Sequence, residues 1–469
     1  MDNFGRLLHK YLKNKPSYSI SAFAKDIGIS AGLLNHIFNG KRTMSADKFY
    51  KTVNNNIFDL RERENLRDAY FIERYGESDY KKLQLLSKTI IGLHFGAAPE
   101  INICTRITDN GYGELETKEE IFSALKELFS STGNEIYTNI RHSNNAVNDV
   151  LYSLKKEFSS SALTRFVSGF SPKITEKSLS SLFSIIRFAK AGVNTLSLEK
   201  NEAEHLDKTT LFPYFIISDK MLILLDAQYE KGIALTGEKI VSDKYSKCIL
   251  TARESQSVVN FFKNEFEAVN YIINFESEKI FSLKSTPCFL AVNDLSFLSE
   301  AMADCSDKKE LISFLNNRRT DKQWYNVCTQ SGLENFLETG KTYEISRTFI
   351  KNFSLKSRQL FIDSLIDTMK NDKIYHNTFL ERNIIISDFF KNIDISVYDN
   401  SCLIATIPDE PDDKSFLCQI SLHIKGGEFL RICKIFLSDY LVISGEVLSN
   451  QTSMLYLKGI QIELQRRDK

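Results

Sequence analysis

The sequence predicts a multidomain α+β protein, in which an N-terminal all-α bundle is followed by a helix-rich α/β region. Residues 20–42 contain two short amphipathic segments joined by a glycine, the pattern of two helices linked by a tight turn. From residue 117 onward, helical and strand patterns alternate, as in a sheet covered by helices. The 469 residues are 42% hydrophobic, with only seven Pro, which suffices for two or three ordered domains.

Changes in pattern along the chain divide it into four expected parts. Residues 1–58 hold the glycine-joined helix pair, and 59–116 form a helical bridge and linker. An α/β domain is expected over 117–280 and a C-terminal α+β domain over 281–469. The chain shows no tandem repeat and no low-complexity tract.

The N-terminal helices are predicted from apolar spacing and from the residues that flank it. Asp59 and Glu62 have the spacing of a capping box, which predicts a helix beginning there. The helices expected in this part cover 4–13, 21–27, 31–38, 46–53, 59–75 and 79–95.

Elements beyond residue 95 are predicted from helical or strand periodicity. The helices expected there cover 119–129, 145–158, 179–191, 255–273, 294–303, 308–316, 331–338, 357–372, 427–437 and 449–467. The strands expected there cover 101–107, 135–140, 164–169, 195–198, 212–217, 221–226, 288–292, 395–398, 402–406 and 416–422. The strands at 212–217 and 221–226 are separated by a short polar turn and predict a hairpin.

The turn between the two short helices has the residues that a tight, defined hinge requires. Gly28 follows the last residue of the first helix, where a left-handed backbone is usual and glycine adopts it without steric cost. Ala24 is small enough to let the two helices approach closely. Ser30 is a good N-cap for the second helix, because its hydroxyl can accept a hydrogen bond from a backbone amide.

The second helix has a polar outer face that suits the major groove of DNA. Asn35 can pair with an adenine edge, and His36 can donate or accept a hydrogen bond. Ser30 and the helix N-terminus suit a phosphate, and Lys41 and Arg42 are expected to meet the DNA backbone. The candidate DNA-binding residues are Ser30, Ala31, Gly32, Asn35, His36, Asn39, Lys41 and Arg42.

Charge is distributed unevenly along the chain. Lys plus Arg equals Asp plus Glu at 60 each, which argues against a protein that coats nucleic acid along its length. Residues 1–60 carry nine basic and four acidic side chains, a net charge of +5. The basic excess therefore coincides with the helix pair, and the remainder is nearly neutral.

The segment AKDIGISAGLLNHIFNGKR resembles the hinge and recognition helix of the phage-repressor (Xre/Cro/cI-like) helix-turn-helix family. The resemblance covers about residues 3–58. It implies a DNA-binding domain that pairs on symmetric half-sites as a homodimer. Three features depart from the family pattern. Ile20 replaces a frequent polar residue, Ala31 and Gly32 begin the recognition helix, and Phe38 stands where the family often has Glu.

Cysteine usage and hydropathy favour a cytoplasmic protein. The eight cysteines include no Cys-x-x-Cys pair and lie mostly beside apolar residues, as expected of reduced, buried thiols. The sequence shows no signal peptide and no apolar run near 18 residues, so neither export nor membrane contact is expected. No metal site and no cofactor are predicted.

One pair near the C-terminus suggests a second interpretation. His423 and Lys425 are similar to the histidine and lysine of phospholipase-D-type phosphotransfer sites, where the histidine attacks phosphorus and the lysine binds phosphate. That family has an Asp five residues beyond the lysine, and this chain has Leu430 there. A strand-end histidine beside a lysine is the simpler interpretation.

Three functions follow from these patterns. The first is a non-enzymatic, sequence-specific transcriptional regulator that binds duplex DNA and has a large ligand-sensing or dimerisation region. Its effector would be an unidentified small molecule or peptide. The alternative is a DNA-binding head fused to a degenerate phosphodiesterase-like enzyme or defence effector. The third is a scaffold whose head binds protein.

Overall fold

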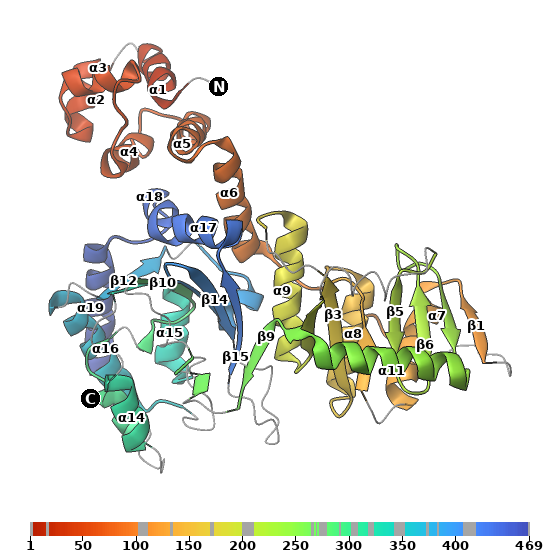
Figure 1. The fold of residues 1–469 in the computed structure, drawn as a ribbon. Coiled ribbons are helices and arrows are strands. Elements are labelled where there is room, and N and C mark those ends of the chain that lie inside the picture. Colours follow the sequence, from red (N-terminus) through yellow and green to blue (C-terminus); the bar gives the residue numbers. More distant parts are fainter. Residues whose placement is uncertain are drawn as a thin grey trace.

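The chain forms a helical N-terminal bundle and two β-sheets covered by helices (Figure 1), which confirms the predicted α+β class. This arrangement is seen in a computed structural model. The residues described are 3–15, 18–101, 111–131, 135–168, 173–198, 211–263, 267–268, 270–271, 279–289, 292–301, 308–317, 323–341, 352–371, 375–381, 384–406 and 419–467.

Five helices form the N-terminal bundle, and a sixth leads out of it. They are α1 (Phe4–Lys13), α2 (Ile20–Ile27), α3 (Ala31–Phe38), α4 (Ala46–Val53), α5 (Leu60–Tyr75) and α6 (Glu77–Gly92). The predicted bounds of α1, α3 and α4 are confirmed. The capping box is also confirmed, because Asp59 accepts from the Glu62 amide and Glu62 accepts from the Asp59 amide.

The first sheet has eight strands in the order β1-β7-β6-β5-β2-β3-β4-β8. They are β1 (Tyr112–Leu115), β2 (Glu135–Thr138), β3 (Ala162–Ser168), β4 (Asn194–Leu198), β5 (Tyr214–Ile217), β6 (Leu222–Leu225), β7 (Gly232–Leu235) and β8 (Gln256–Ser257). Strands β2, β3 and β4 are parallel, and the other pairings are antiparallel. The β5–β6 pair confirms the predicted hairpin.

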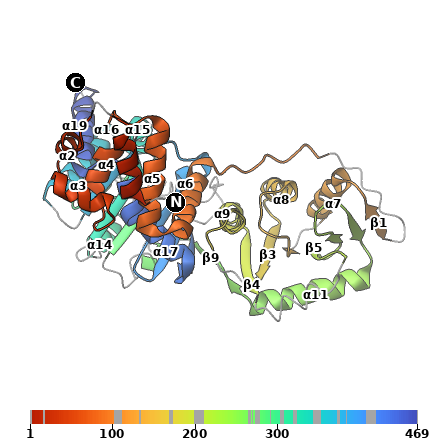
Figure 2. The same cartoon turned by 90° about the horizontal axis from the view of Figure 1, so that it is seen from above.

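Helices cover both faces of the first sheet. They are α7 (Lys118–Ser131), α8 (Ala146–Glu157), α9 (Glu176–Lys190) and α11 (Glu238–Glu254). Figure 2 shows α7, α8 and α9 on one face and α11 on the other. Helices α8 and α9 connect the parallel strands, because such strands need a crossover on one face of the sheet.

The second sheet has seven strands in the order β12-β11-β10-β13-β14-β15-β9. They are β9 (Val259–Phe262), β10 (Lys279–Lys284), β11 (Gln323–Thr329), β12 (Tyr375–Leu380), β13 (Ile393–Val397), β14 (Ser401–Thr406) and β15 (Gln419–Lys425). Strands β10, β11 and β12 are parallel to one another. Strands β8 and β9 follow each other directly, so the chain passes from one sheet to the other there.

Two sets of helices pack on opposite faces of the second sheet. One set is α13 (Ser296–Ala301), α14 (Lys308–Asn317), α15 (Gln330–Thr339), α16 (Leu355–Asn371) and α19 (Asn450–Arg467). The other is α17 (Gly427–Ile435), a π-helical turn (Phe436–Tyr440) and α18 (Leu441–Ile443). A 3-10 helix spans Asp388–Asn392. Figure 1 shows that α17 and α18 lie between the second sheet and the bundle.

The bundle is attached to the second sheet by a continuous apolar core and by ion pairs. Tyr440 of the π-helical turn packs against Phe71, with ring centroids 5.2 Å apart. Asp439 accepts two hydrogen bonds from Arg74, at 2.8 and 3.0 Å, and one from the Tyr75 hydroxyl at 2.9 Å. A π-helical turn often marks a functional position, and here it presents two adjacent side chains to the bundle.

Helix α6 is bound to α17 by charged side chains. Lys82 lies 2.6 Å from Glu428, and Arg431 forms a bidentate pair with Asp79. Glu428 also accepts a hydrogen bond from the backbone amide of Ile174, just before α9. The Glu428 carboxylate, on a helix that covers the second sheet, therefore binds both α6 and the segment that leads into α9 of the first sheet.

Several strands differ from those expected from the sequence. The helix predicted over 255–273 is wrong at residues 256–262, which form β8 and β9. The strand predicted at 288–292 is wrong at its described residues 288, 289 and 292, and a strand lies earlier, at Lys279–Lys284. Strands β1, β7, β11 and β12 were not anticipated. The strand expected at 101–107 lies almost wholly outside the described residues.

The candidate nucleic-acid interface

Helix α3 has the geometry that its sequence predicts. The Ser30 hydroxyl accepts a hydrogen bond from the Leu33 amide at 3.1 Å and so caps the helix N-terminus. Leu34, Ile37 and Phe38 are buried against the rest of the bundle. The apolar side of α3 is therefore anchored, and its other side is left to solvent.

The hinge before α3 depends on a left-handed glycine. Gly28 has φ of 73°, and its amide donates to the Lys25 carbonyl at 3.0 Å. The Ile29 amide donates to the Ala24 carbonyl at 2.9 Å, which closes the end of α2. The predicted hinge is therefore present, and the buried Ala24 side chain lies within it.

Two residues that support α3 were not identified from the sequence. A Cβ atom at Gly5 would lie 1.9 Å from the Ile37 carbonyl oxygen, so α1 and α3 can approach this closely only with glycine. The His9 ring stacks on Phe38, with centroids 4.5 Å apart. Burial, with a smaller contribution from Lys13, lowers the pKa of His9. A glycine inside the first helix was the only signal of this packing.

The candidate residues near the N-terminus of α3 lie on its accessible side. Ser30, Gly32, Asn35 and His36 are exposed, and Ala31 is half-buried. Successive positions 32, 35 and 36 share one helix face because three or four residues make one turn. The structure thus places Asn35 and His36 side by side on the outer face of the bundle.

The candidate residues that follow α3 are also exposed. The Asn39 side-chain amide donates to the Asn35 carbonyl at 2.8 Å and helps to end the helix. The Lys41 amide donates to the His36 carbonyl at 2.9 Å, which turns the chain back toward the helix. The backbone therefore holds Lys41 and Arg42 beside the C-terminal end of α3. A DNA backbone flanking the groove would pass this point if α3 entered the groove.

Lys48 adds a cation near the hinge. Its ammonium group lies 3.3 Å from the position of a Cβ atom built at Gly28, and it pairs with Asp47 at 3.3 Å. Spacing alone does not link Lys48 with Gly28, because Lys48 lies on α4 and Gly28 in the hinge after α2. Lys48 therefore lies close to the hinge before α3, whereas Lys41 and Arg42 follow the helix.

Helix α3 lies at the outer edge of the molecule, away from both sheets (Figure 1). Figure 1 shows α2 and α3 on the far side of the bundle from both sheets, with α4, α5 and α6 between them and the sheets. The ion pairs that hold the bundle involve Arg74 in α5 and Lys82 in α6. The attachment of the bundle and its outward face therefore use different helices.

The alternative function rests on His423 and Lys425. Both lie on β15, and the Tyr271 hydroxyl is 3.2 Å from His423 Nδ1. Burial, followed by the charge of Lys425, lowers the pKa of His423. Leu430 is buried in α17, at the position where the related family has an aspartate. Within the described ranges, no cluster of His, Cys, Asp or Glu could hold a metal ion.

The other sequence expectations concern cysteines and membrane spans. The described free cysteines are all buried, as predicted, and they are Cys248, Cys288, Cys328, Cys402 and Cys433. Burial raises the pKa of the Cys248 thiol to about 12. None of the helices in the described parts of the chain has the length and apolar character required to cross a bilayer.

Comparisons with known proteins identify no family. No family profile matches the chain, and no curated protein matches it. Among solved structures, TrmBL2, an archaeal chromatin protein, is 12% identical, with a TM-score of 0.23 over 55% of this chain and 100% of its own. Phosphatidylserine synthase of Haemophilus influenzae Rd KW20 is 8% identical, with a TM-score of 0.24 over 82% and 97%. These scores are too low to support a shared fold or function.

Proposed function

We propose that this chain is a sequence-specific DNA-binding transcriptional regulator. In this proposal α3 enters the major groove, Asn35 and His36 read base edges, and Lys41 and Arg42 contact phosphates. The observation that carries the proposal is the outward, capped and polar face of α3 on a bundle whose opposite side is bound to the body. The resemblance of residues 3–58 to the phage-repressor family supports the same assignment.

The two sheets would serve as the ligand-sensing or dimerisation region of the regulator. Support comes from the way the bundle is attached. Asp439 and Glu428 connect it directly to the helices on the second sheet. A change in the position of α17 would therefore move the bundle with it. We assign no catalytic step to His423 or Lys425.

The proposal is tested by selecting bound sequences from random duplex DNA with the purified full-length chain. We expect enrichment of a short motif, and of its inverted repeat if two heads bind together. The matched control is the Asn35→Ala/His36→Ala variant, which keeps every buried contact of α3. Equal enrichment by the variant and the native chain, or no motif with either, would refute the proposed reading face.

A further inference from the structure

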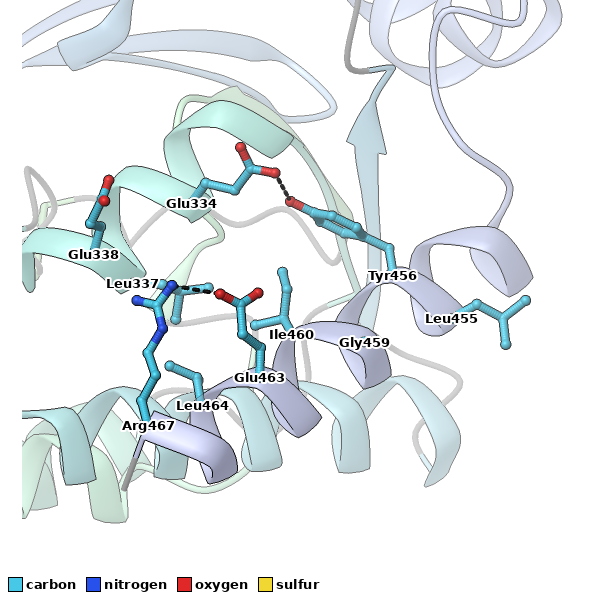
Figure 3. Close-up of a pocket in the computed structure, with 10 residues that line it drawn as sticks. All are labelled: Glu334, Leu337, Glu338, Leu455, Tyr456, Gly459, Ile460, Glu463, Leu464 and Arg467. Carbon is cyan, nitrogen blue, oxygen red and sulfur yellow. Dashed lines mark hydrogen bonds and ion pairs between the residues drawn. The ribbon is translucent and has the colours of Figure 1, made fainter. Parts of the chain in front are cut away.

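A groove opens between α15 and α19, on the face of the second sheet opposite to α17 (Figure 3). Its volume is about 510 Å³. Leu337, Ile460 and Leu464 form its apolar floor, and these side chains belong to the core beneath. The groove is therefore built on a packed part of the fold.

Helix α19 also exposes apolar side chains beside this groove. Leu455 is 62% exposed and Ile462 is 52% exposed. Together with Gly459 they lie at positions i, i+4 and i+7, which places all three on one helix face. Such an exposed apolar stripe is typical of a contact surface.

Gly459 is the residue that opens the middle of this surface. It lies inside an 18-residue helix, where glycine is less favourable than alanine. A Cβ atom built there would meet no atom within 4 Å. The fold of the described chain therefore does not require glycine at this position, whereas a second helix lying across it would benefit from the missing side chain.

The two helices that border the groove carry opposite charges. Helix α15 contributes Glu334 and Glu338, and its ten residues include no Lys or Arg. Helix α19 lines the groove with Glu463 and Arg467, which are paired at 2.5 Å, and its other charged residues, Lys458 and Arg466, are exposed outside the groove. An apolar helix with basic residues would complement this groove, and α19 itself has that composition.

We propose that this surface is an isologous dimer interface, in which α19 of each chain lies in the α15–α19 groove of a second copy. A two-fold axis then places each acidic α15 opposite the partner's basic α19, so one patch satisfies both chains. The interface is distinct from the DNA-binding face and does not depend on it. It would hold two bundles in one symmetric particle.

The first test measures self-association of full-length chains by sedimentation equilibrium from about 1 to 100 µM, the range expected for a small interface. Gly459→Phe fills the groove and is expected to weaken the dimer at least tenfold. Gly459→Ala adds only a methyl group to open space and should have a smaller effect. Circular dichroism checks that both variants are folded. A native chain that stays monomeric, or a dimer unaffected by Gly459→Phe, would overturn the proposal.

A charge exchange gives a second and stricter test. Glu338→Arg places a basic residue on α15, and Arg466→Glu places an acidic one on α19. Each variant alone then repels its own copy, but a mixture can form a heterodimer in which both helix contacts join opposite charges. We expect about tenfold weaker association of each variant alone and recovery in the mixture. Failure of the mixture to recover would mean that another surface or another partner occupies the groove.

DNA binding is measured separately on a single half-site, which one bundle can occupy. Loss of the dimer with unchanged half-site affinity would support the interface and leave the proposed function intact. Half-site binding that is absent in the native chain would refute the function while the sedimentation data still decide on the dimer.

Discussion

The two sides of the N-terminal bundle differ in what their polar side chains do. On the inward side, Arg74, Tyr75 and Lys82 are engaged with carboxylates of the second-sheet region. On the outward side, Asn35 and His36 are exposed on α3. The bundle is therefore positioned by one set of helices, and the exposed face of α3 belongs to the other set. We therefore expect substitutions on one side to change DNA binding and substitutions on the other to change stability.

On the inward side, a single carboxylate of the second-sheet region binds more than one side chain of the bundle. Asp439 accepts three hydrogen bonds, and this bonding raises the pKa of the Arg74 guanidinium. Tyr50 of α4 also lies against Gly445, where a Cβ atom would come within 2.4 Å of the ring. The bidentate pair of Arg74 with Asp439 fixes the orientation of the two side chains as well as the distance between them. The direction in which α3 points is consequently set by residues far from α3 in sequence.

The largest effect is expected from replacing both base-reading candidates on the outward side. Asn35→Ala/His36→Ala should weaken binding to the selected sequence by at least about 30-fold, because two base contacts are lost and each is worth about 1–3 kcal/mol. Thermal stability should stay unchanged, since both side chains are exposed. Footprinting on the selected operator measures the loss. An unchanged footprint would mean that α3 does not read the bases.

A smaller and sequence-independent effect is expected from the residues after α3. Lys41→Ala/Arg42→Ala should weaken binding to all duplexes by about tenfold and lower the salt slope by about two, because two phosphate contacts are removed. Titrations at several salt concentrations, with specific and unrelated DNA, measure both quantities. The control is Lys10→Ala, which removes an exposed cation from α1. A salt slope equal to that of the native chain would remove both residues from the interface.

The inward side is tested by Asp439→Ala. We expect the free energy of opening of α5 and α6 to fall by about 1–2 kcal/mol, because Arg74 and Tyr75 lose a shared charged acceptor. Hydrogen exchange of amides in these helices measures the change. Ser438→Ala, on the same π-helical turn, is the control. Half-site DNA affinity should not change, and a tenfold loss would show that the two sides are not independent.

The sequence predicted the bundle well because its signals are local. Gly28, Ser30 and Asp59 each act on backbone atoms within a few residues, so spacing alone located their helices. Residues that act over long distances were missed. Arg74 and Asp439 are 365 positions apart, and nothing in either neighbourhood indicates the other.

The strands were harder to predict for the same physical reason. Residues 256–262 were assigned to a helix, yet they pair with β4 in one sheet and β15 in the other. Strand pairing depends on partners elsewhere in the chain, and short apolar runs suit both helix and strand. The candidate DNA-binding residues, in contrast, were all located on the expected helix or directly beside it.

The smallest effect concerns the pH dependence of the inward side. The hydrogen bond from Arg431 lowers the pKa of Asp79, and that from Lys82 lowers the pKa of Glu428. A carboxyl with a lowered pKa stabilises the folded state when ionised. Its contribution is therefore complete above the ordinary values of 3.8 and 4.5 and is lost as pH falls through the lowered ones.

Asp79→Asn isolates this contribution, because asparagine does not titrate. Near pH 6 the variant should lower the free energy of opening of α6 by about 0.5 kcal/mol, a small value because the pair is partly exposed to solvent. The difference between variant and native chain should begin to shrink as the pH falls below 3.8, where the carboxyl of the opened state is protonated. It should vanish once the pH lies below the lowered pKa, where the folded carboxyl is protonated too. Hydrogen exchange of α6 amides at each pH gives the free energy of opening for the variant and for the native chain. A difference that grows on acidification would mean that Asp79 does not stabilise the attachment through its charge.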